Sequence, residues 1–165
     1  MHKYIVCIGS NYNRTENLTF ARQKLAEQFS PIYRAPELET EPLFFKNPAL
    51  FSNQVIMFFS DKDEELVKRI LKDIELASGR LPEDKKEEKV CLDIDILLYD
   101  DKIIKPEDWE REYVQQSLSA LYSSLSITLA NLMAERESAA MERPATPKAA
   151  SRSTSVSWRA IWLDS

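Results

Sequence analysis

KVCLDIDILLY, residues 89–99, decides the fold, because apolar residues hold every second position of this stretch. The alternating residues are Val90, Leu92, Ile94, Ile96 and Leu98. Strict alternation predicts a β-strand with one face packed against a core. Asp93 and Asp95 fall on the other face, about 7 Å apart, because side chains at i and i+2 point the same way.

The two aspartates repel each other at this spacing, so their pairing requires an explanation. One explanation is a divalent cation, since Mg²⁺ takes oxygen ligands and is often held by one or two carboxylates together with substrate phosphates. The other is a solvated acidic face on an edge strand, because Asp-x-Asp is a common sequence. The strand by itself leaves both interpretations open.

Composition narrows the class of protein. The chain has 165 residues, 44% of them hydrophobic and 30% charged, which predicts a single globular domain. A net charge of -5 argues against a general nucleic-acid binder, although a nucleotide needs only local cations. No apolar run is long enough for a signal peptide or a membrane helix, so we expect a cytoplasmic protein without a membrane partner.

Histidine and cysteine are too scarce for several kinds of site. The single histidine, His2, leaves little scope for histidine-based catalysis or transition-metal binding. Cys7 and Cys91 lie far apart inside predicted strands. We therefore expect two reduced thiols rather than a disulfide or a metal pair.

The order of predicted elements indicates the fold class. It is a strand at 3–8, a helix at 14–29, an extended stretch at 32–40, a strand at 51–59, a helix at 62–78, and the strand within 89–99. This β-α-β-β-α-β order is typical of an α+β, ferredoxin-like fold, an antiparallel sheet with its helices on one face. We expect the other face to be open and to carry Asp93 and Asp95.

The helices and loops carry more specific expectations. The apolar stripes predict buried faces at Leu18, Ala21, Leu25 and Phe29, and at Leu66, Ile70, Ile74 and Ala77. Loop 81–89 is highly charged and is expected to be mobile. Pro106 suits a helix start, and the helix is expected to run on through Trp109, Tyr113, Val114 and Leu118.

Two candidate ligand positions stand out. The chain has only two glycines, and we expect Gly79 to stop a helix. Gly9 either lets a ligand approach the backbone or makes a plain turn. Asn53 shares a strand face with Phe51, where the pair suits a planar polar ligand through stacking and hydrogen bonds. Ordinary polarity at a strand end is the alternative.

We predict a domain at 1–120 and an extension at 121–165. A leucine stripe continues the last helix, through Leu118, Leu121, Leu125, Leu129 and Leu132, and would pack on the domain or on a second copy, giving a monomer or weak dimer. Residues 137–157 have the composition of a disordered, low-complexity segment, and Trp158 and Trp162 have no explanation. A tail not native to the domain, such as a frame-shifted end, is one hypothesis.

Four segments together resemble one enzyme family. They are IGSN at 8–11, ETEP at 39–42 with NPALFSNQV at 47–55, IELASGR at 74–80 and LDIDILLY at 92–99. Over residues 3–118 the chain resembles 6-hydroxymethyl-7,8-dihydropterin pyrophosphokinase. This resemblance implies the transfer of pyrophosphate from ATP to the hydroxymethyl group of the pterin in folate biosynthesis, with release of AMP. It also implies small-molecule partners and two Mg²⁺ ions.

The resemblance assigns roles to residues. Asp93 and Asp95 match the metal-binding aspartates and, with Arg80, are the catalytic candidates. The pterin candidates are Gly9, Asn11, Thr40, Pro42, Leu43, Phe51, Asn53 and Tyr113. The ATP candidates are Glu75, Arg80, Lys89, Ile96 and Arg111.

The chain also departs from the family. The loop before the aspartates, LPEDKKEEKV, has lysines where the family commonly ends in an arginine, and IIKPEDWEREY lacks the usual histidine. Lysine supplies charge but not a bidentate fork. Three hypotheses follow: an active pyrophosphokinase, a pterin-binding module without ATP chemistry, and an interaction domain whose aspartates bind nothing. No residue is an evident general base.

Overall fold

The computed structural model of the chain describes residues 1–142. Residues Met1–Leu129 form one compact unit, and Ala130–Ser165 form a second. Within the described part, no helix is long and apolar enough to cross a membrane. The fold below is that of the first unit.

The elements follow one another as strands and helices of ordinary length. They are β1 (His2–Ser10), α1 (Arg14–Phe29), β2 (Ile32–Arg34), β3 (Leu38–Thr40), β4 (Phe51–Ser60), α2 (Glu64–Ala77), the 3-10 turn η1 (Pro82–Lys85), β5 (Asp93–Tyr99), β6 (Lys102–Ile103), α3 (Pro106–Trp109) and α4 (Glu112–Met141). The expected extended stretch at 32–40 is thus two short strands, and Gly79, with φ of 92°, ends α2 as predicted.

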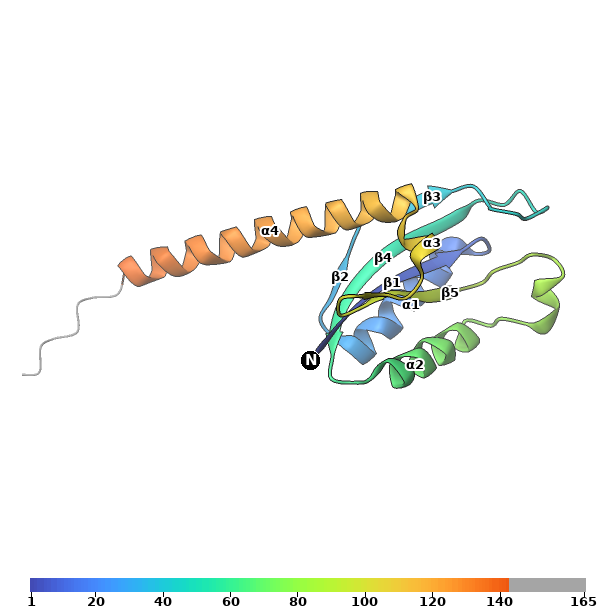
Figure 1. Ribbon diagram of the computed structural model, residues 1–165, viewed down its shortest axis with the longest axis horizontal. Helices are drawn as coiled ribbons and strands as arrows, with labels where there is room; N and C mark the ends of the chain where they lie inside the picture. Colours follow the sequence, from blue (N-terminus) through green and yellow to red (C-terminus); the bar gives the residue numbers. More distant parts are fainter. Residues whose placement is uncertain (143–165) are drawn as a thin grey trace, which may run out of the picture. The chain divides into compact units, whose positions relative to one another are not determined.

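One antiparallel sheet organises the unit. Its strand order is β2-β4-β1-β5-β6, and β3 also pairs with β4. β1 lies at the centre, between β4 and β5. This topology confirms the α+β, ferredoxin-like prediction, and Figure 1 shows α1 and α2 together on one side of the sheet.

The first core lies between these helices and the sheet. Leu92, Ile94 and Ile96 of the predicted strand pack there against the buried stripe of α1, which is the predicted one: Leu18, Ala21, Leu25 and Phe29. The predicted stripe of α2 is confirmed only at Ile74, which is buried, and at Ile70, which packs against the core. Val67 and Leu71 are buried in place of Leu66 and Ala77, which are exposed. This rotation turns Glu75 inward, where its Oε1 accepts a hydrogen bond from the Ile94 amide at 2.8 Å.

The second face of the sheet is not open, contrary to expectation. The first turns of α4 cover part of it, with Val114, Leu118 and Leu121 buried against Ile5, Val55 and Leu97. The expected single helix after Pro106 is also wrong, because α3 ends at Trp109 and α4 begins at Glu112. The break between them turns α4 across the sheet, so only one end of this face remains uncovered.

A β-bulge interrupts the alternation in β5. Ile5 pairs with Leu98 while Val6 pairs with Ile96, so Leu97 is an extra residue. Leu97 and Leu98 therefore both join the second core, and the predicted placement of Leu98 with Ile96 is wrong. Asp93 and Asp95 precede the bulge and keep their predicted face.

The predicted leucine stripe divides in two. Leu118 and Leu121 are buried on the sheet and Leu125 is partly buried, whereas Leu129 and Leu132 are exposed. In the second unit, the described residues continue α4 to Met141, so 137–141 are helical rather than disordered. The rest of the segment 137–157, with Trp158 and Trp162, lies outside the described residues.

Candidate active site

A cavity of about 240 Å³ opens at the uncovered end of the second face. We call it the aromatic cavity. It is lined by Cys7, Gly9, Thr40, Glu41, Leu43, Phe44, Phe45, Phe51, Asn53, Asp93, Asp95, Leu97, Asp108, Arg111 and Tyr113. These residues come from β1, β3, the segment after β3, β4, β5, α3, α4 and the break between these two helices, so the site exists only in the folded chain.

One wall places an amide next to an aromatic ring. Phe51 and Asn53 share the face of β4 that looks into the cavity. The Asn53 Nδ2 donates a hydrogen bond to Thr40 Oγ1 at 2.7 Å, which fixes the amide plane. Within residues 1–142 the Asn53 Oδ1 accepts no hydrogen bond, so it remains free for a ligand donor.

Gly9 makes room for this amide. It lies within β1, opposite Asn53 and Asp93, rather than in a turn after the strand. A Cβ at this position would stand 3.0 Å from the Asn53 Oδ1. Glycine is therefore needed for close approach, as one sequence interpretation held, although the neighbour is a side chain of the chain itself.

The opposite wall begins at the break between α3 and α4. There Arg111 Nη2 pairs with Asp108 Oδ1 at 3.0 Å, and Tyr113 follows in the first turn of α4. Both Arg111 and Tyr113 line the aromatic cavity. Because Phe51 and Tyr113 come from different walls, a flat ring between them would contact an aromatic side chain from each.

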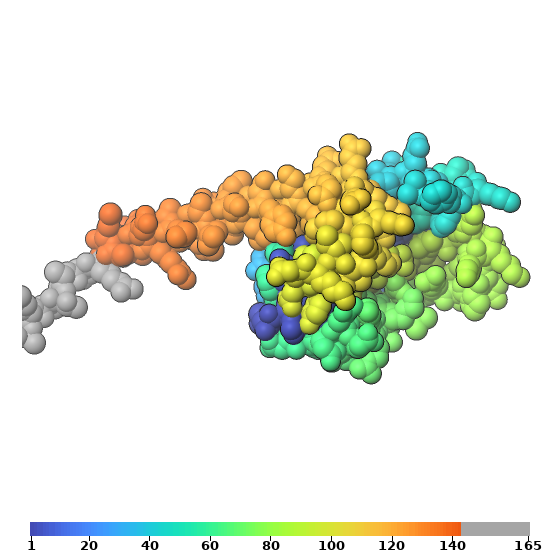
Figure 2. Space-filling model, in the orientation of Figure 1, coloured from blue at the N-terminus to red at the C-terminus, as the bar shows by residue number. Residues whose placement is uncertain are grey.

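The segment 41–50 forms the rim of the aromatic cavity. The Phe45 ring lies 5.7 Å from that of Phe51, whereas Phe44 is 100% exposed and has a φ of 61°. Figure 2 shows this segment (cyan) projecting beside the α3 region (yellow). Apolar residues so exposed at the rim of a cavity are suited to contact a ligand.

Asp93 and Asp95 form the floor. Burial raises the pKa of Asp93 to about 7, with further contributions from the charges of Asp95 and Glu75. Within residues 1–142 no cluster of three or more histidine, cysteine or acidic side chains could hold a metal alone. Two repelling carboxylates beside a cavity nevertheless fit Mg²⁺, which completes its shell with water and phosphate oxygens.

A second cavity, of about 220 Å³, lies next to the same carboxylates. We call it the lysine cavity, since Lys68, Lys72 and Lys105 line it together with Glu75, Asp93, Asp95, Ile96 and three other apolar residues. Lys72 Nζ donates to Glu75 Oε2 at 2.7 Å, and Lys105 forms an ion pair with Asp95. Asp93 and Asp95 therefore lie where the two cavities meet.

Most of the residues predicted for the site line one of these cavities. Gly9, Thr40, Leu43, Phe51, Asn53, Arg111 and Tyr113 line the aromatic cavity, and Glu75 and Ile96 line the lysine cavity. Four do not: Pro42, Asn11, Arg80 and Lys89. Arg80 stands 3.8 Å from Glu75, while Asn11 and Lys89 are part of a separate polar network.

Lys105 is the clearest omission from the sequence interpretation. The hairpin of β5 and β6 folds the chain back, so the Ile104 amide donates to the Leu97 carbonyl and Lys105 returns to Asp95. Asp108, Glu41 and Lys72 were missed as well. The turn signal Asp100-Asp101 indicates a reversal, but only the register of the hairpin shows which later residue meets the aspartates.

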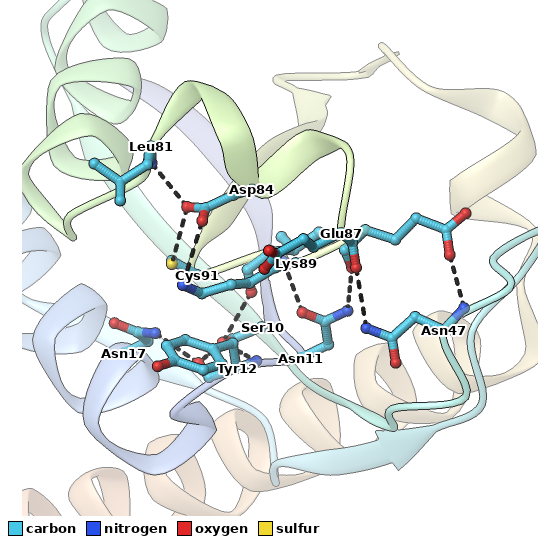
Figure 3. A network of polar contacts seen from close by, with 12 residues as sticks. Ser10, Asn11, Tyr12, Asn17, Asn47, Leu81, Asp84, Glu87, Lys89 and Cys91 are labelled. Atoms are coloured by element: carbon cyan, nitrogen blue, oxygen red, sulfur yellow. Dashed lines mark hydrogen bonds and ion pairs between the residues drawn. The ribbon is translucent and has the colours of Figure 1, made fainter.

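Loop 81–90 is folded rather than irregular (Figure 3). The Asp84 carboxylate, in a residue only 3% exposed, accepts from the Leu81 amide at 2.7 Å and pairs with Lys89 at 3.2 Å. Asn11 Oδ1 accepts from the Val90 amide at 2.6 Å. These contacts satisfy the polar groups of a loop that the sequence predicted to be mobile, and its mobility stays a prediction.

The same loop also contacts the rim of the aromatic cavity. The Asn47 amide donates to Glu88 Oε2 at 2.7 Å, and the Asn11 Nδ2 donates to the Glu88 carbonyl at 2.8 Å. Lys89 Nζ lies 3.9 Å from the centre of the Tyr12 ring. Loop 81–90 thus links segment 41–50 to Asn11, which follows β1, and Lys89 does not line the aromatic cavity.

We expect Asp84→Ala to loosen this loop. The Leu81 amide and Lys89 lower the pKa of Asp84, against the opposing effect of burial, so the folded loop favours the carboxylate. Its contribution is therefore present above the ordinary aspartate pKa and is lost as the pH falls through the lowered value. Hydrogen exchange of amides 83–90 should be about tenfold faster in the variant.

Glu83→Gln is the matched control, because Glu83 is the exposed neighbour of Asp84. It should leave the exchange rates of the loop unchanged. In the unsubstituted chain the protection factors of the same amides, which correct for the intrinsic pH dependence of exchange, should fall only at strongly acidic pH. Equal protection of the loop in Asp84→Ala and in the original chain would contradict the role given to Asp84.

Comparison with known proteins identifies the family. A comparison with curated proteins found no match. A comparison with protein families matches residues 5–123 to the family described as 7,8-dihydro-6-hydroxymethylpterin-pyrophosphokinase (HPPK). The match includes every strand that builds the two cavities and the first turns of α4. The chain therefore belongs to the 7,8-dihydro-6-hydroxymethylpterin-pyrophosphokinase family.

Proposed function

We propose that the chain transfers pyrophosphate from ATP to the hydroxymethyl group of 6-hydroxymethyl-7,8-dihydropterin and releases AMP. One observation carries the proposal: Asp93 and Asp95 line both the aromatic cavity and the lysine cavity. A pterin in the first cavity and a triphosphate in the second would meet at these carboxylates. A group transfer between two bound substrates needs this kind of shared boundary.

In this proposal the aromatic cavity binds the pterin. Phe51 and Tyr113 contact the two faces of the ring, and Asn53 binds its polar edge through the free Oδ1. Thr40 and Gly9 act on Asn53, the first by a hydrogen bond and the second by leaving space. Leu43 closes the rim.

The lysine cavity binds the triphosphate. Ammonium groups of Lys68, Lys72 and Lys105 supply positive charge, and Arg111 supplies a guanidinium from the aromatic cavity. Two Mg²⁺ ions held by Asp93 and Asp95, when bound, would neutralise the phosphate charge that builds up during transfer. Glu75 fixes Lys72 and the start of β5, while Arg80 lies close enough to Glu75 to reach the phosphates by a side-chain rotation.

The test is a coupled measurement of binding and turnover. AMP should form from ATP only when both the pterin and Mg²⁺ are present, and calorimetry should detect the pterin in the presence of α,β-methylene-ATP, whose α–β bridge cannot be cleaved. The absence of AMP, in a protein that passes a thermal unfolding check, would contradict the proposal.

A pterin-binding module without ATP chemistry is the second candidate. It is favoured by Lys89, which is paired with Asp84 outside both cavities and so supplies no charge to the phosphates. This candidate predicts a calorimetric signal for the pterin together with no AMP. The two measurements therefore separate the candidates.

A further inference from the structure

Lys105 is the only residue that the structure pairs with a proposed metal ligand through an opposite charge, within residues 1–142. Its Nζ forms an ion pair with Asp95 Oδ1. The side chains of Lys105 and Asp95 are 43% and 31% exposed, so the pair lies at the boundary of the lysine cavity rather than in the core. Solvent therefore reaches the pair, and it can separate at modest cost.

The position of Lys105 in the chain explains how it reaches Asp95. It follows β6 and stands immediately before Pro106, which opens α3. The hairpin and the ring of Pro106, which restricts the backbone of the residue before it, hold the backbone of Lys105, while four methylene groups leave the ammonium free to move. A fixed backbone and a flexible side chain would allow the ammonium group of Lys105 to move from one partner to another.

Asp95 is also a proposed metal ligand, and a metal ion and an ammonium group compete for the same carboxylate oxygens. Two cations in contact with the same carboxylate repel each other, since both would lie within a few ångströms of the same oxygens. Mg²⁺ therefore has to displace Lys105 from Asp95. The other lysines of the cavity are not in this position, because Lys72 pairs with Glu75 and Lys68 with Glu64.

We propose that Lys105 is an exchangeable counter-ion, which neutralises Asp95 before substrate binds and moves onto the phosphate oxygens when Mg-ATP enters the lysine cavity. This inference rests on the proposed function, since it assumes that a triphosphate binds there. In this role Lys105 supplies a phosphate-binding cation to a chain that lacks the arginine and the histidine common in the family. Its consequence is that Lys105 opposes a metal ion alone and favours a metal ion that arrives with nucleotide.

The test uses Lys105→Met, which keeps the length of the side chain and removes the charge. Binding of Mn²⁺ alone, measured by the electron paramagnetic resonance of the free ion, should be roughly fivefold tighter than in the original chain. Binding of Mg²⁺ with α,β-methylene-ATP, measured by calorimetry, should be about tenfold weaker. A purely structural role for Lys105 would weaken both.

Two further variants sharpen the test. Lys102→Met removes an exposed lysine from the same hairpin and should change neither affinity. Lys105→Arg keeps a cation beside Asp95 and should leave the Mn²⁺ affinity near that of the original chain. Changes of opposite sign in Lys105→Met alone support the proposal; unchanged Mn²⁺ binding, or unchanged nucleotide binding, in that variant overturns it.

Failure of the proposed function gives a different result. If the chain makes no AMP but Lys105→Met still binds Mn²⁺ more tightly, the enzymatic proposal fails and the competition between Lys105 and the metal ion at Asp95 stands. The affinity for Mg²⁺ with α,β-methylene-ATP then decides whether Lys105 also binds the phosphates. If the chain makes AMP and Lys105→Met shows no opposite changes, the further inference alone is overturned. If neither the original chain nor Lys105→Met binds Mn²⁺, both the proposed metal site and the role of Lys105 are overturned.

Discussion

Replacing Asp95 with alanine should lower the rate of AMP formation by about a thousandfold or more. The substitution removes a carboxylate that lines both cavities, so the phosphates would lose their metal contact at the point of transfer. It also leaves Lys105 without its partner. The rate should be measured at saturating ATP and pterin, so that the loss appears in kcat rather than in substrate binding.

Asp101→Ala is the control for this variant, since Asp101 is exposed in the turn of the same hairpin. It should keep the full rate. Thermal unfolding should show that Asp95→Ala remains folded, because Asp95 lies outside the two hydrophobic cores. If Asp95→Ala retained more than about a tenth of the original rate, the proposal that Asp95 is a metal ligand would be wrong.

Replacing Asn53 with leucine should raise the dissociation constant of the pterin by about a hundredfold. Leucine has the same number of side-chain heavy atoms in the same branched arrangement, so it fills the position of the amide while the polar group that meets the edge of the ring is lost. Asn53 is 8% exposed, which means that a ligand bound there must satisfy its polar atoms without help from bulk water. Calorimetry with the pterin measures the effect directly.

Thr40→Val separates direct binding from positioning. It removes the hydroxyl that accepts from the Asn53 amide, but it leaves the amide itself in place. We expect a loss of pterin affinity about tenfold smaller than that of Asn53→Leu. Unchanged pterin affinity in Asn53→Leu, with Mn²⁺ binding preserved, would show that the ring does not bind against β4.

Local patterns predicted much of the first unit. The alternation in β5 and the stripe of α1 each depend on residues close in sequence. The stripe was predicted correctly, and the alternation was predicted correctly as far as Ile96. The bulge at Leu97 could not be predicted, because it is defined by pairing with β1. The rotation of α2 could not be predicted either, since it goes together with a buried hydrogen bond between Glu75 and the Ile94 amide, 19 residues away in the sequence.

The candidate site shows the same division. Phe51, Asn53 and the two aspartates were identified from strand alternation and resemblance, because their faces are set locally. Lys105, Asp108 and Glu41 come to the cavities through a hairpin, a helix break and a rim segment. Their positions depend on long-range geometry. Lys89 lines neither cavity because it pairs with Asp84, a contact that the sequence of the loop does not reveal.

The bulge at Leu97 has a consequence for comparing members of the family. Lys105 meets Asp95 because one additional residue lies between the aspartate and the hairpin turn. In a relative without that residue, a lysine ten positions after the aspartate would point to the other side of the sheet. The number of residues between Asp95 and the hairpin turn therefore decides whether a lysine at this distance can hold its charge against that carboxylate.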